Sequence, residues 1–217
     1  MKIRAVFFDL DGTLLNTLED LADSANAALQ KHGLPVHPVD AYRHFVGSGA
    51  ITLITRAMPP GKRSDEIIEA CYRDFRREYD RRWDQKTQPY AGIPELLDEL
   101  QARGIRMAVL SNKPQAAAEL CVKRFLAQWP FDPVRGEQPG IPVKPDPAGA
   151  LAMAARLGLR PEEVLYLGDS DVDMHTAVRA GFLPAGALWG FRTEKELIEA
   201  GARAVLSRPA DLLPLLA

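Results

Sequence analysis

The sequence predicts an α/β protein in which a Rossmann-like parallel sheet, flanked by helices, is interrupted by an inserted all-helical domain. Three observations predict this fold. Short runs of β-branched, aromatic and other apolar residues alternate with helical patterns, as in chains that build a sheet from βαβ units. The segment between residues 15 and 90 shows helical patterns and no convincing strand. Reactive side chains follow three of the apolar runs, where open parallel sheets bind their ligands.

Five apolar runs are the candidate strands. Residues 3–9 (IRAVFFD), 104–113 (GIRMAVLSNK) and 163–171 (EVLYLGDSD) are continuous enough to predict buried parallel strands. The run at 183–190 (LPAGALWG) is weaker, and 202–208 (ARAVLSR) is short and suits an edge strand. Helical patterns precede the second and third strands, at residues 93–103 and 147–159.

The insert is predicted to contain helices only. An amphipathic helix is expected at residues 17–33, and residues 38–58 indicate a helix, a glycine turn and a second helix. A long charged helix follows an expected N-cap at Ser64. Residues 87–95 are interpreted as the hinge through which the chain returns.

These patterns set the expected domain boundaries. We expect the α/β core domain to comprise residues 1–15 and 91–217, and the helical cap domain to comprise residues 16–90. A chain of 217 residues is long enough to bury a substantial core in this arrangement.

Bulk composition excludes several function classes. A formal net charge of -2 and a pI of about 6.1 leave no basic footprint of the kind that dominates nucleic-acid affinity. No segment approaches the roughly 20 apolar residues that cross a bilayer, and the first apolar run is too short for a secretion signal. The 2 cysteines match no metal spacing and indicate a reducing compartment. We therefore expect a cytoplasmic protein without nucleic-acid or membrane partners, either a monomer or a homodimer.

Reactive side chains gather where the predicted strands end. In chain order they are Asp9, Asp11, Ser111, Asn112, Asp169 and Asp173, and Lys144 lies between the second and third of these strands, just before a proline turn and a helix. Carboxylates clustered at one sheet edge repel one another, and a divalent cation relieves that repulsion. The ligand set is all oxygen, which favours Mg²⁺ over zinc. In proteins Mg²⁺ keeps some of its waters and binds substrate phosphates. The hydroxyl of Ser111 and the ammonium group of Lys144 are suited to bind the oxygens of such a phosphoryl group.

These motifs, in this order, resemble those of the haloacid dehalogenase (HAD) superfamily. The matching stretches are DLDGT, the serine of VLSN, the lysine of KPDP, and GDSDVDM, and the resemblance spans nearly the whole chain. The insert resembles the helical C1-type cap of the subgroup that includes phosphoglycolate phosphatase, on the stretches FVGSGAITLITRAM, PYAGIPELLDELQARGIRMAVLSNKP and ALWGF. The resemblance implies an HAD-like core, a mobile cap, and a Mg²⁺-dependent phosphomonoester hydrolase acting on a small phosphorylated metabolite.

The resemblance also implies catalytic roles. Asp9 would be the nucleophile that forms an aspartyl-phosphate. Asp11 would protonate the leaving oxygen and then activate the hydrolytic water. Ser111 would bind a phosphoryl oxygen, and Lys144 would offset charge on the phosphoryl group and the nucleophile.

Binding roles are implied in the same way. Mg²⁺ would be held by Asp9, the backbone carbonyl of Asp11 and Asp169, with Asp173 acting through water or at close range behind it. Substrate binding would involve backbone or side-chain groups of Gly12, Thr13, Asn112, Gly47, Ser48 and Gly49. The last three lie in the cap loop VGSGA, which is otherwise only a turn between helices.

Several alternatives stay open. The leading substrate is 2-phosphoglycolate, and other small organic phosphates, inorganic pyrophosphate and sugar phosphates remain candidates. A phosphomutase resembling beta-phosphoglucomutase would return the phosphoryl group to a sugar, and a non-catalytic regulatory module is a third hypothesis. Asp171 is either functional or the N-cap of the helix that follows. Arg43 and Arg56 flank the cap loop and could meet a substrate carboxylate.

Overall fold

A computed structural model describes residues 2–216, and the chain divides into two compact units. The sheet unit comprises Met1–Leu15 and Pro89–Ala217, and the helical unit comprises Asn16–Gln88. Among the residues described, no helix combines the length and apolar character needed to span a membrane.

The sheet unit is built on a parallel sheet whose strands, within residues 2–216, follow the order β5-β4-β1-β6-β7-β8. Each neighbouring pair runs parallel. The strands are β1 (Ala5–Phe8), β4 (Arg106–Pro114), β5 (Phe131–Glu137), β6 (Val164–Gly168), β7 (Leu183–Ala187) and β8 (Ala204–Leu206). β1 lies at the centre and is buried on both faces, which explains its continuous apolar run. The predicted parallel α/β sheet is confirmed.

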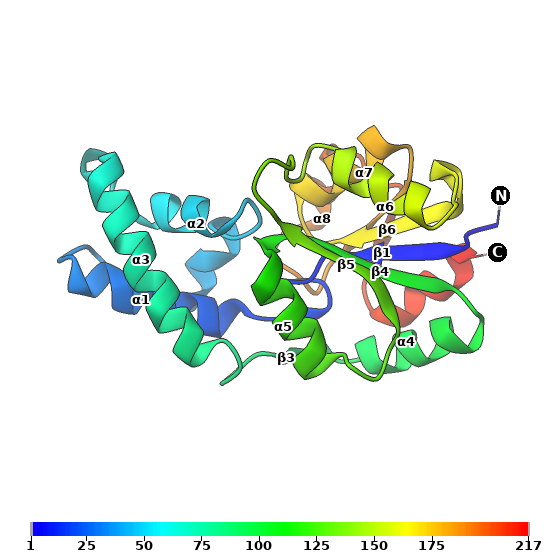
Figure 1. The fold of residues 1–217 in the computed structure, drawn as a ribbon, viewed down its shortest axis with the longest axis horizontal. Coiled ribbons are helices and arrows are strands. Elements are labelled where there is room, and N and C mark those ends of the chain that lie inside the picture. The colour runs from blue at the N-terminus through cyan, green and yellow to red at the C-terminus, as the bar shows by residue number, and fades with distance from the viewer. Residues whose placement is uncertain (1, 217) are drawn as a thin grey trace. The chain divides into compact units, whose positions relative to one another are not determined.

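Helices flank the sheet on both faces, as Figure 1 shows. They are α4 (Ile93–Ala102), α5 (Gln115–Phe125), α6 (Ala148–Arg156), α7 (Asp171–Ala180) and α8 (Glu194–Glu199), with the 3₁₀ helices η3 (Pro161–Glu163) and η4 (Pro209–Leu216). On one face of the sheet, Phe7 and Tyr166 form a cluster of buried side chains with Met153 of α6 and Ala177 of α7. This core fixes the carboxyl ends of β1, β4 and β6, which carry the candidate site.

Within the described residues 2–216, one strand of this six-stranded sheet is not predicted by the sequence. β5 has the sequence FDPVRGE, which contains a proline, a glycine and three charged residues in place of an apolar run. It pairs only with β4, so it is an edge strand, where proline and partial exposure are tolerated. The short edge strand predicted at residues 202–208 is confirmed as β8 at the opposite edge.

The helical unit contains the helices expected for the insert. They are α1 (Leu18–Lys31), η1 (Val39–His44), α2 (Ala50–Ala57), η2 (Pro60–Lys62) and α3 (Asp65–Arg82). The predicted N-cap is confirmed, because the hydroxyl of Ser64 accepts a hydrogen bond from the Ile67 N–H. The helix expected after Pro38 is a short 3₁₀ helix, and the loop that follows it contains Gly47 and Gly49 with positive φ values.

The expectation that residues 15–90 contain no strand is wrong at the two ends of the segment. β2 (Leu15–Asn16) and β3 (Gln88–Pro89) pair in a small separate sheet where the chain leaves and re-enters the sheet unit. Two residues are too few to show a period in the sequence, so no pattern could predict them.

Candidate active site

Asp9 follows β1 directly, and its place in the sheet sets its direction. Its N–H donates to the Leu167 carbonyl of β6 at 3.0 Å, which continues the strand pairing by one residue. One carboxylate oxygen accepts from the Leu10 N–H at 2.7 Å and lies 3.0 Å from Lys144 Nζ. The side chain is only 8% exposed. Asp9 is therefore a fixed, nearly buried carboxylate beside an ammonium group.

Asp169 is held by two donors from distant parts of the chain. The Thr13 hydroxyl donates to Oδ1 at 2.8 Å, and the Phe191 N–H donates to Oδ2 at 2.9 Å. Gly12 stands so close that a Cβ there would lie 2.3 Å from Oδ2, and its φ of +85° also favours glycine. The same crowding applies at Gly190, where a Cβ would lie 2.2 Å from the Cβ of Asp169.

Asp173 accepts hydrogen bonds on both of its carboxylate oxygens. Lys144 Nζ donates to Oδ1 at 2.6 Å, and the Tyr166 hydroxyl donates to the same oxygen at 3.3 Å. Oδ2 accepts from the Ser170 hydroxyl at 2.6 Å and from the Ser170 and Asp169 N–H groups at 3.0 and 3.2 Å. With this many donors, Asp173 orients Lys144 and the start of α7.

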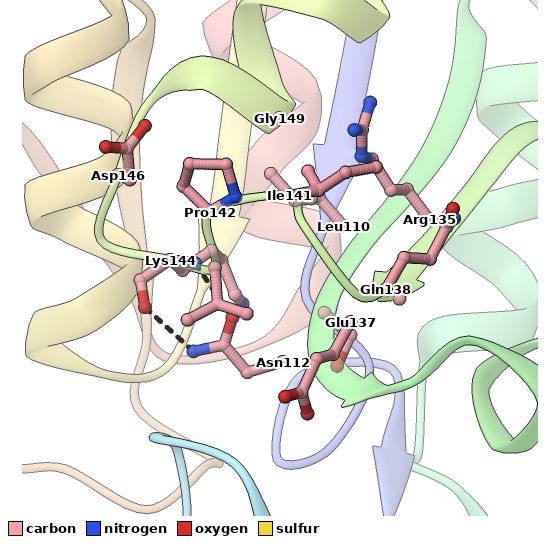
Figure 2. A pocket seen from close by; sticks show the side chains of 13 residues that line it. Leu110, Asn112, Arg135, Glu137, Gln138, Ile141, Pro142, Lys144, Asp146 and Gly149 are labelled. Atoms are coloured by element: carbon pink, nitrogen blue, oxygen red, sulfur yellow. Dashed lines mark hydrogen bonds between the residues drawn. The ribbon is translucent and has the colours of Figure 1, made fainter.

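Asn112 on β4 fixes the backbone of Lys144. Its side-chain amide donates to the Lys144 carbonyl and accepts from the Lys144 N–H, each at 2.9 Å, as the dashed lines in Figure 2 show. Both residues line a small pocket together with Ser111, whose hydroxyl oxygen accepts the Lys113 N–H at 3.3 Å. That bond uses an acceptor position of the hydroxyl and leaves its hydrogen for another acceptor, such as a phosphoryl oxygen.

Asp11 points to a residue that the sequence analysis did not select. Lys113 Nζ lies 3.0 and 3.1 Å from the two Asp11 oxygens. The only signal in the sequence was its place two residues after Ser111, in a stretch that resembles the family motif. That resemblance implies no role for the lysine. Tyr166 was missed for another reason: inside an apolar strand it looks like a core residue.

The three carboxylates of Asp9, Asp169 and Asp173 form a group that could hold a metal ion. One oxygen from each lies within 4.8 Å of the others, and all three residues are buried. Burial raises the pKa of Asp9 to about 7, although the nearby Lys144 ammonium opposes that shift. Burial and the charges of Asp173 and Asp9 hold the pKa of Asp169 well above its usual range. The site thus carries more negative charge than its donors offset, and its all-oxygen ligand set fits a hard divalent cation such as Mg²⁺.

Lys144 remains charged in this surrounding. Burial by itself would lower the pKa of its ammonium group, but Asp173 and Asp9 hold that pKa well above its usual range. A permanent ammonium beside Asp9 can offset charge on an incoming anion. Together, a nucleophilic carboxylate, a fixed cation, a hydroxyl donor and a metal-binding oxygen set suit phosphoryl transfer.

The structure brings most of the predicted residues together in the sheet unit. Thr13 is fully buried, and its hydroxyl donates a hydrogen bond to Asp169. The Gly12 N–H donates to the Leu15 carbonyl at 2.9 Å. The Gly12 N–H is therefore engaged within the chain, and the substrate contacts of Gly12 and Thr13 stay predictions. The Asp11 carboxylate lies outside the group of three, so only its backbone carbonyl remains a predicted ligand.

The predicted cap residues lie in the helical unit, in the loop before α2. Gly47 and Gly49 have φ values of +114° and +87°, which explains the glycines of this turn. Arg56 donates to the Ser48 hydroxyl at 3.1 Å, and Arg43 to Asp40 at 2.7 Å. Their contacts with a substrate stay predictions.

The helix-cap alternative for Asp171 is wrong. Ser170 is the N-cap of α7: its hydroxyl accepts from the Asp173 N–H at 3.3 Å, and the Asp173 carboxylate accepts from the Ser170 N–H in return. Asp171 is the first residue of the helix proper, half exposed, with Arg192 Nε 3.6 Å from its carboxylate. An acidic residue in the first turn still favours the helix dipole.

Comparisons with known proteins identify the family and its relatives. The family of haloacid dehalogenase-like hydrolases matches residues 6–186. Phosphoglycolate phosphatase of Pasteurella multocida (strain Pm70) is 32% identical, over 99% of this chain and 99% of its own. N-acetylmuramic acid 6-phosphate phosphatase of Pseudomonas aeruginosa is 30% identical, over 100% of this chain and 96% of its own. A crystal structure of a predicted phosphoglycolate phosphatase from Haemophilus somnus 129pt has a TM-score of 0.92 at 27% identity, covering 100% and 99% of the two chains.

Proposed function

The chain belongs to the haloacid dehalogenase-like hydrolase family, and from that membership we propose that it is a Mg²⁺-dependent phosphomonoesterase with Asp9 as its nucleophile. One observation carries the proposal. A buried carboxylate stands at the carboxyl end of the central strand, 3.0 Å from an ammonium group and close to two further buried carboxylates. Such a group has a fixed direction, a cation beside it and little competing water.

The proposed reaction has two steps. First, a carboxylate oxygen of Asp9 attacks phosphorus while the bond to the leaving oxygen breaks, and Asp11 gives that oxygen its proton. Second, a water attacks the phosphorus of the aspartyl-phosphate, its proton returns to Asp11, and the bond between Asp9 and phosphorus breaks. One water is consumed, an alcohol and inorganic phosphate leave, and both aspartates are restored.

Other residues of the sheet unit support these steps. Lys144 offsets charge on Asp9 and on the phosphoryl oxygens, and the Ser111 hydroxyl donates to one of those oxygens. Asp9, Asp169 and the backbone carbonyl of Asp11 would hold Mg²⁺, with Asp173 behind them. When bound, the ion supplies positive charge that offsets the carboxylates and the phosphoryl group.

The proposed substrate is a small phosphate ester of a carboxylic acid, with 2-phosphoglycolate as the leading candidate. Relatives at 30% identity and above include enzymes named for phosphoglycolate and for N-acetylmuramic acid 6-phosphate. Both names denote phosphate esters of acids, so a sugar-acid phosphate is the second candidate. The loop at residues 47–49 and the two flanking arginines stay the predicted contacts for the non-phosphate end.

Matched pairs of substrates test this assignment. 2-Phosphoglycolate is compared with ethyl phosphate, and N-acetylmuramic acid 6-phosphate with N-acetylglucosamine 6-phosphate, because only the first member of each pair carries a carboxylate. We expect kcat/KM to favour one acid by tenfold or more over its partner, about 1.4 kcal/mol. Equal values within both pairs would remove the acid specificity. Full phosphatase activity in an Asp9→Asn variant would remove the mechanism itself.

A further inference from the structure

Lys113 is buried against the acid/base aspartate, and we propose that it is a positioning residue which fixes the direction of the Asp11 carboxylate. Its ammonium nitrogen lies 3.0 and 3.1 Å from the two carboxylate oxygens. The inference rests on the proposed phosphatase function, because it assigns a task within that reaction.

The burial of this ion pair separates it from ordinary surface pairs. The Lys113 side chain is 4% exposed and that of Asp11 is 14% exposed. Removing an ammonium group from water is costly unless a partner of opposite charge meets it in good geometry. Contact with both oxygens of one carboxylate gives that geometry and restricts rotation of the carboxylate about its last bond.

The backbone of β4 explains how the lysine reaches this place. Leu110 pairs with Arg135 and Pro114 with Glu137, so β4 advances four residues while β5 advances two. Extra residues in one strand form an irregularity of the β-bulge type, which redirects side chains and is common beside active sites. Consecutive residues of this stretch therefore reach different partners: Asn112 binds the Lys144 backbone, and Lys113 binds Asp11.

Residues of β5 hold the backbone of residues 113–115 in place. A Cβ at Gly136 would lie 2.5 Å from the Lys113 carbonyl oxygen, so only glycine allows this approach. Gln115, two residues after the lysine, accepts from the Gly136 N–H at 2.6 Å and donates to the Val134 carbonyl at 3.0 Å. The position of the Lys113 backbone is thus set by the sheet.

Two lysines contact different carboxylates of the site. Lys144 contacts Asp9 and Asp173, whereas Lys113 contacts Asp11. The Asp11 carboxylate is not part of the group of three that could hold a metal. With its direction fixed by Lys113, Asp11 would face the leaving oxygen, and later the water, in both proton transfers. A misplacement of about 1 Å in such a group costs on the order of a hundredfold in rate.

Kinetics of Lys113→Met with two kinds of leaving group test this role. With an alkyl phosphate that the wild type hydrolyses, we expect kcat to fall about 100-fold, with KM changed less than about threefold. With p-nitrophenyl phosphate, whose leaving group needs little protonation, the first turnover should be slowed less than about tenfold. A burst of p-nitrophenol should follow, because water activation in the second step still needs a directed Asp11.

Three further variants complete the design. In an Asp11→Asn background, Lys113→Met should cause no additional loss of kcat, since the pair acts as one unit. Lys113→Arg keeps the charge and should recover kcat to within about tenfold of the wild type; it also carries the test if the methionine variant does not fold. Lys123→Met, which changes an exposed lysine on α5, is the matched control and should behave as the wild type.

Each other outcome overturns the proposal. An unchanged kcat, a rise in KM alone, or a further loss in the Asp11→Asn background would show that Lys113 does not act through Asp11. A loss confined to substrates that carry a carboxylate would make it a substrate contact. Failure of the proposed function is seen separately, as absent wild-type turnover or as full activity in Asp9→Asn.

Discussion

Both units of the molecule bury carboxylates, but they surround them differently. In the helical unit, Asp20 is 1% exposed and accepts the N–H groups of Lys86 and Thr87 and the Thr87 hydroxyl, at 2.8–3.2 Å. Asp74 meets Lys31 at 2.6 Å and His32 at 2.9 Å, and the hydrogen bond from Lys31 holds its pKa below the usual range. Each of these carboxylates is matched by donors from its own unit.

In the sheet unit, three buried carboxylates share fewer positive charges. Asp9, Asp169 and Asp173 lie together with Lys144 as the ammonium group that touches two of them. Burial raises the pKa values of Asp9 and Asp169, and the charges of the neighbouring carboxylates raise them further. A buried carboxylate therefore stabilises a fold when its partners are complete, whereas Asp9 and Asp169, whose pKa values are raised, are available for chemistry or for a cation.

The substitution Asp9→Asn is expected to have the largest effect and tests the difference between the two units most directly. We expect phosphatase activity to fall by roughly 10⁴-fold or more, because the nucleophile is lost. The metal-free variant should nevertheless melt a few degrees above the wild type, because burial of the ionised Asp9 carboxylate costs more than the nearby Lys144 ammonium offsets. Steady-state kinetics and a thermal melt of the same preparation check both statements. A variant that is inactive and also clearly less stable would contradict the second.

Mg²⁺ should stabilise the protein only through the sheet unit. At about 100 times its dissociation constant, a ligand specific for the folded state contributes about 2.7 kcal/mol, which corresponds to a rise in Tm of about 5–10 °C here. Asp169→Asn should abolish that rise, whereas Asp20→Asn should keep it. Melting curves with and without Mg²⁺, after EDTA treatment, decide the matter. A rise that survives in Asp169→Asn would place the ion elsewhere.

Replacement of Asp20 should show the opposite pattern to Asp9. Asp20→Asn loses charge-assisted hydrogen bonds to the return segment and leaves buried donors poorly matched, so we expect a loss of about 1–3 kcal/mol. Urea unfolding monitored by circular dichroism measures it. Thr87→Val, which removes one donor and keeps the backbone contacts, is the milder control. Unchanged stability in Asp20→Asn would show that these bonds matter little.

The pH dependence of stability should separate Asp9 from a matched carboxylate. The pKa of Asp9 is raised from its ordinary 3.8 to about 7 in the folded state, so its ionisation destabilises the fold. That cost is absent below about pH 4, grows as the pH rises, and is complete above about pH 7. Without metal, the Tm advantage of Asp9→Asn over the wild type should therefore grow across this window. A constant difference would contradict the raised pKa.

The smallest effect is expected at Asp74. Its partners Lys31 and Arg77 are largely exposed, so solvent screens the ion pairs and Asp74→Asn should cost about 1 kcal/mol or less. The loss should shrink in 1 M salt, where exposed charges are screened over about 3 Å. Equilibrium unfolding at low and high salt measures it, with Arg77→Gln as the companion variant. A larger, salt-independent loss would make Asp74 a buried structural centre like Asp20.

Local patterns predicted the parts of the fold that depend on local physics. The continuous apolar run of β1 follows from its burial on both faces, and the Ser64 N-cap from the helix signal beside it. β5 escaped prediction because an edge strand needs no apolar run. Asp171 was open because Ser170 and Asp171 are both good N-caps, and only the hydrogen bonds of α7 distinguish them.

The reactive residue types and their order at the strand ends can be predicted from the amino-acid sequence, because parallel strands carry their carboxyl ends to one edge of the sheet whatever the loops between them do. Tertiary structure alone decided which partner each residue meets. Lys113 is 102 positions from Asp11, and Thr13 is 156 positions from Asp169. No periodicity links residues so far apart, since such pairs are set by strand order, register and a local irregularity in β4. Those contacts distinguish the carboxylates of the site from the matched carboxylates of the helical unit.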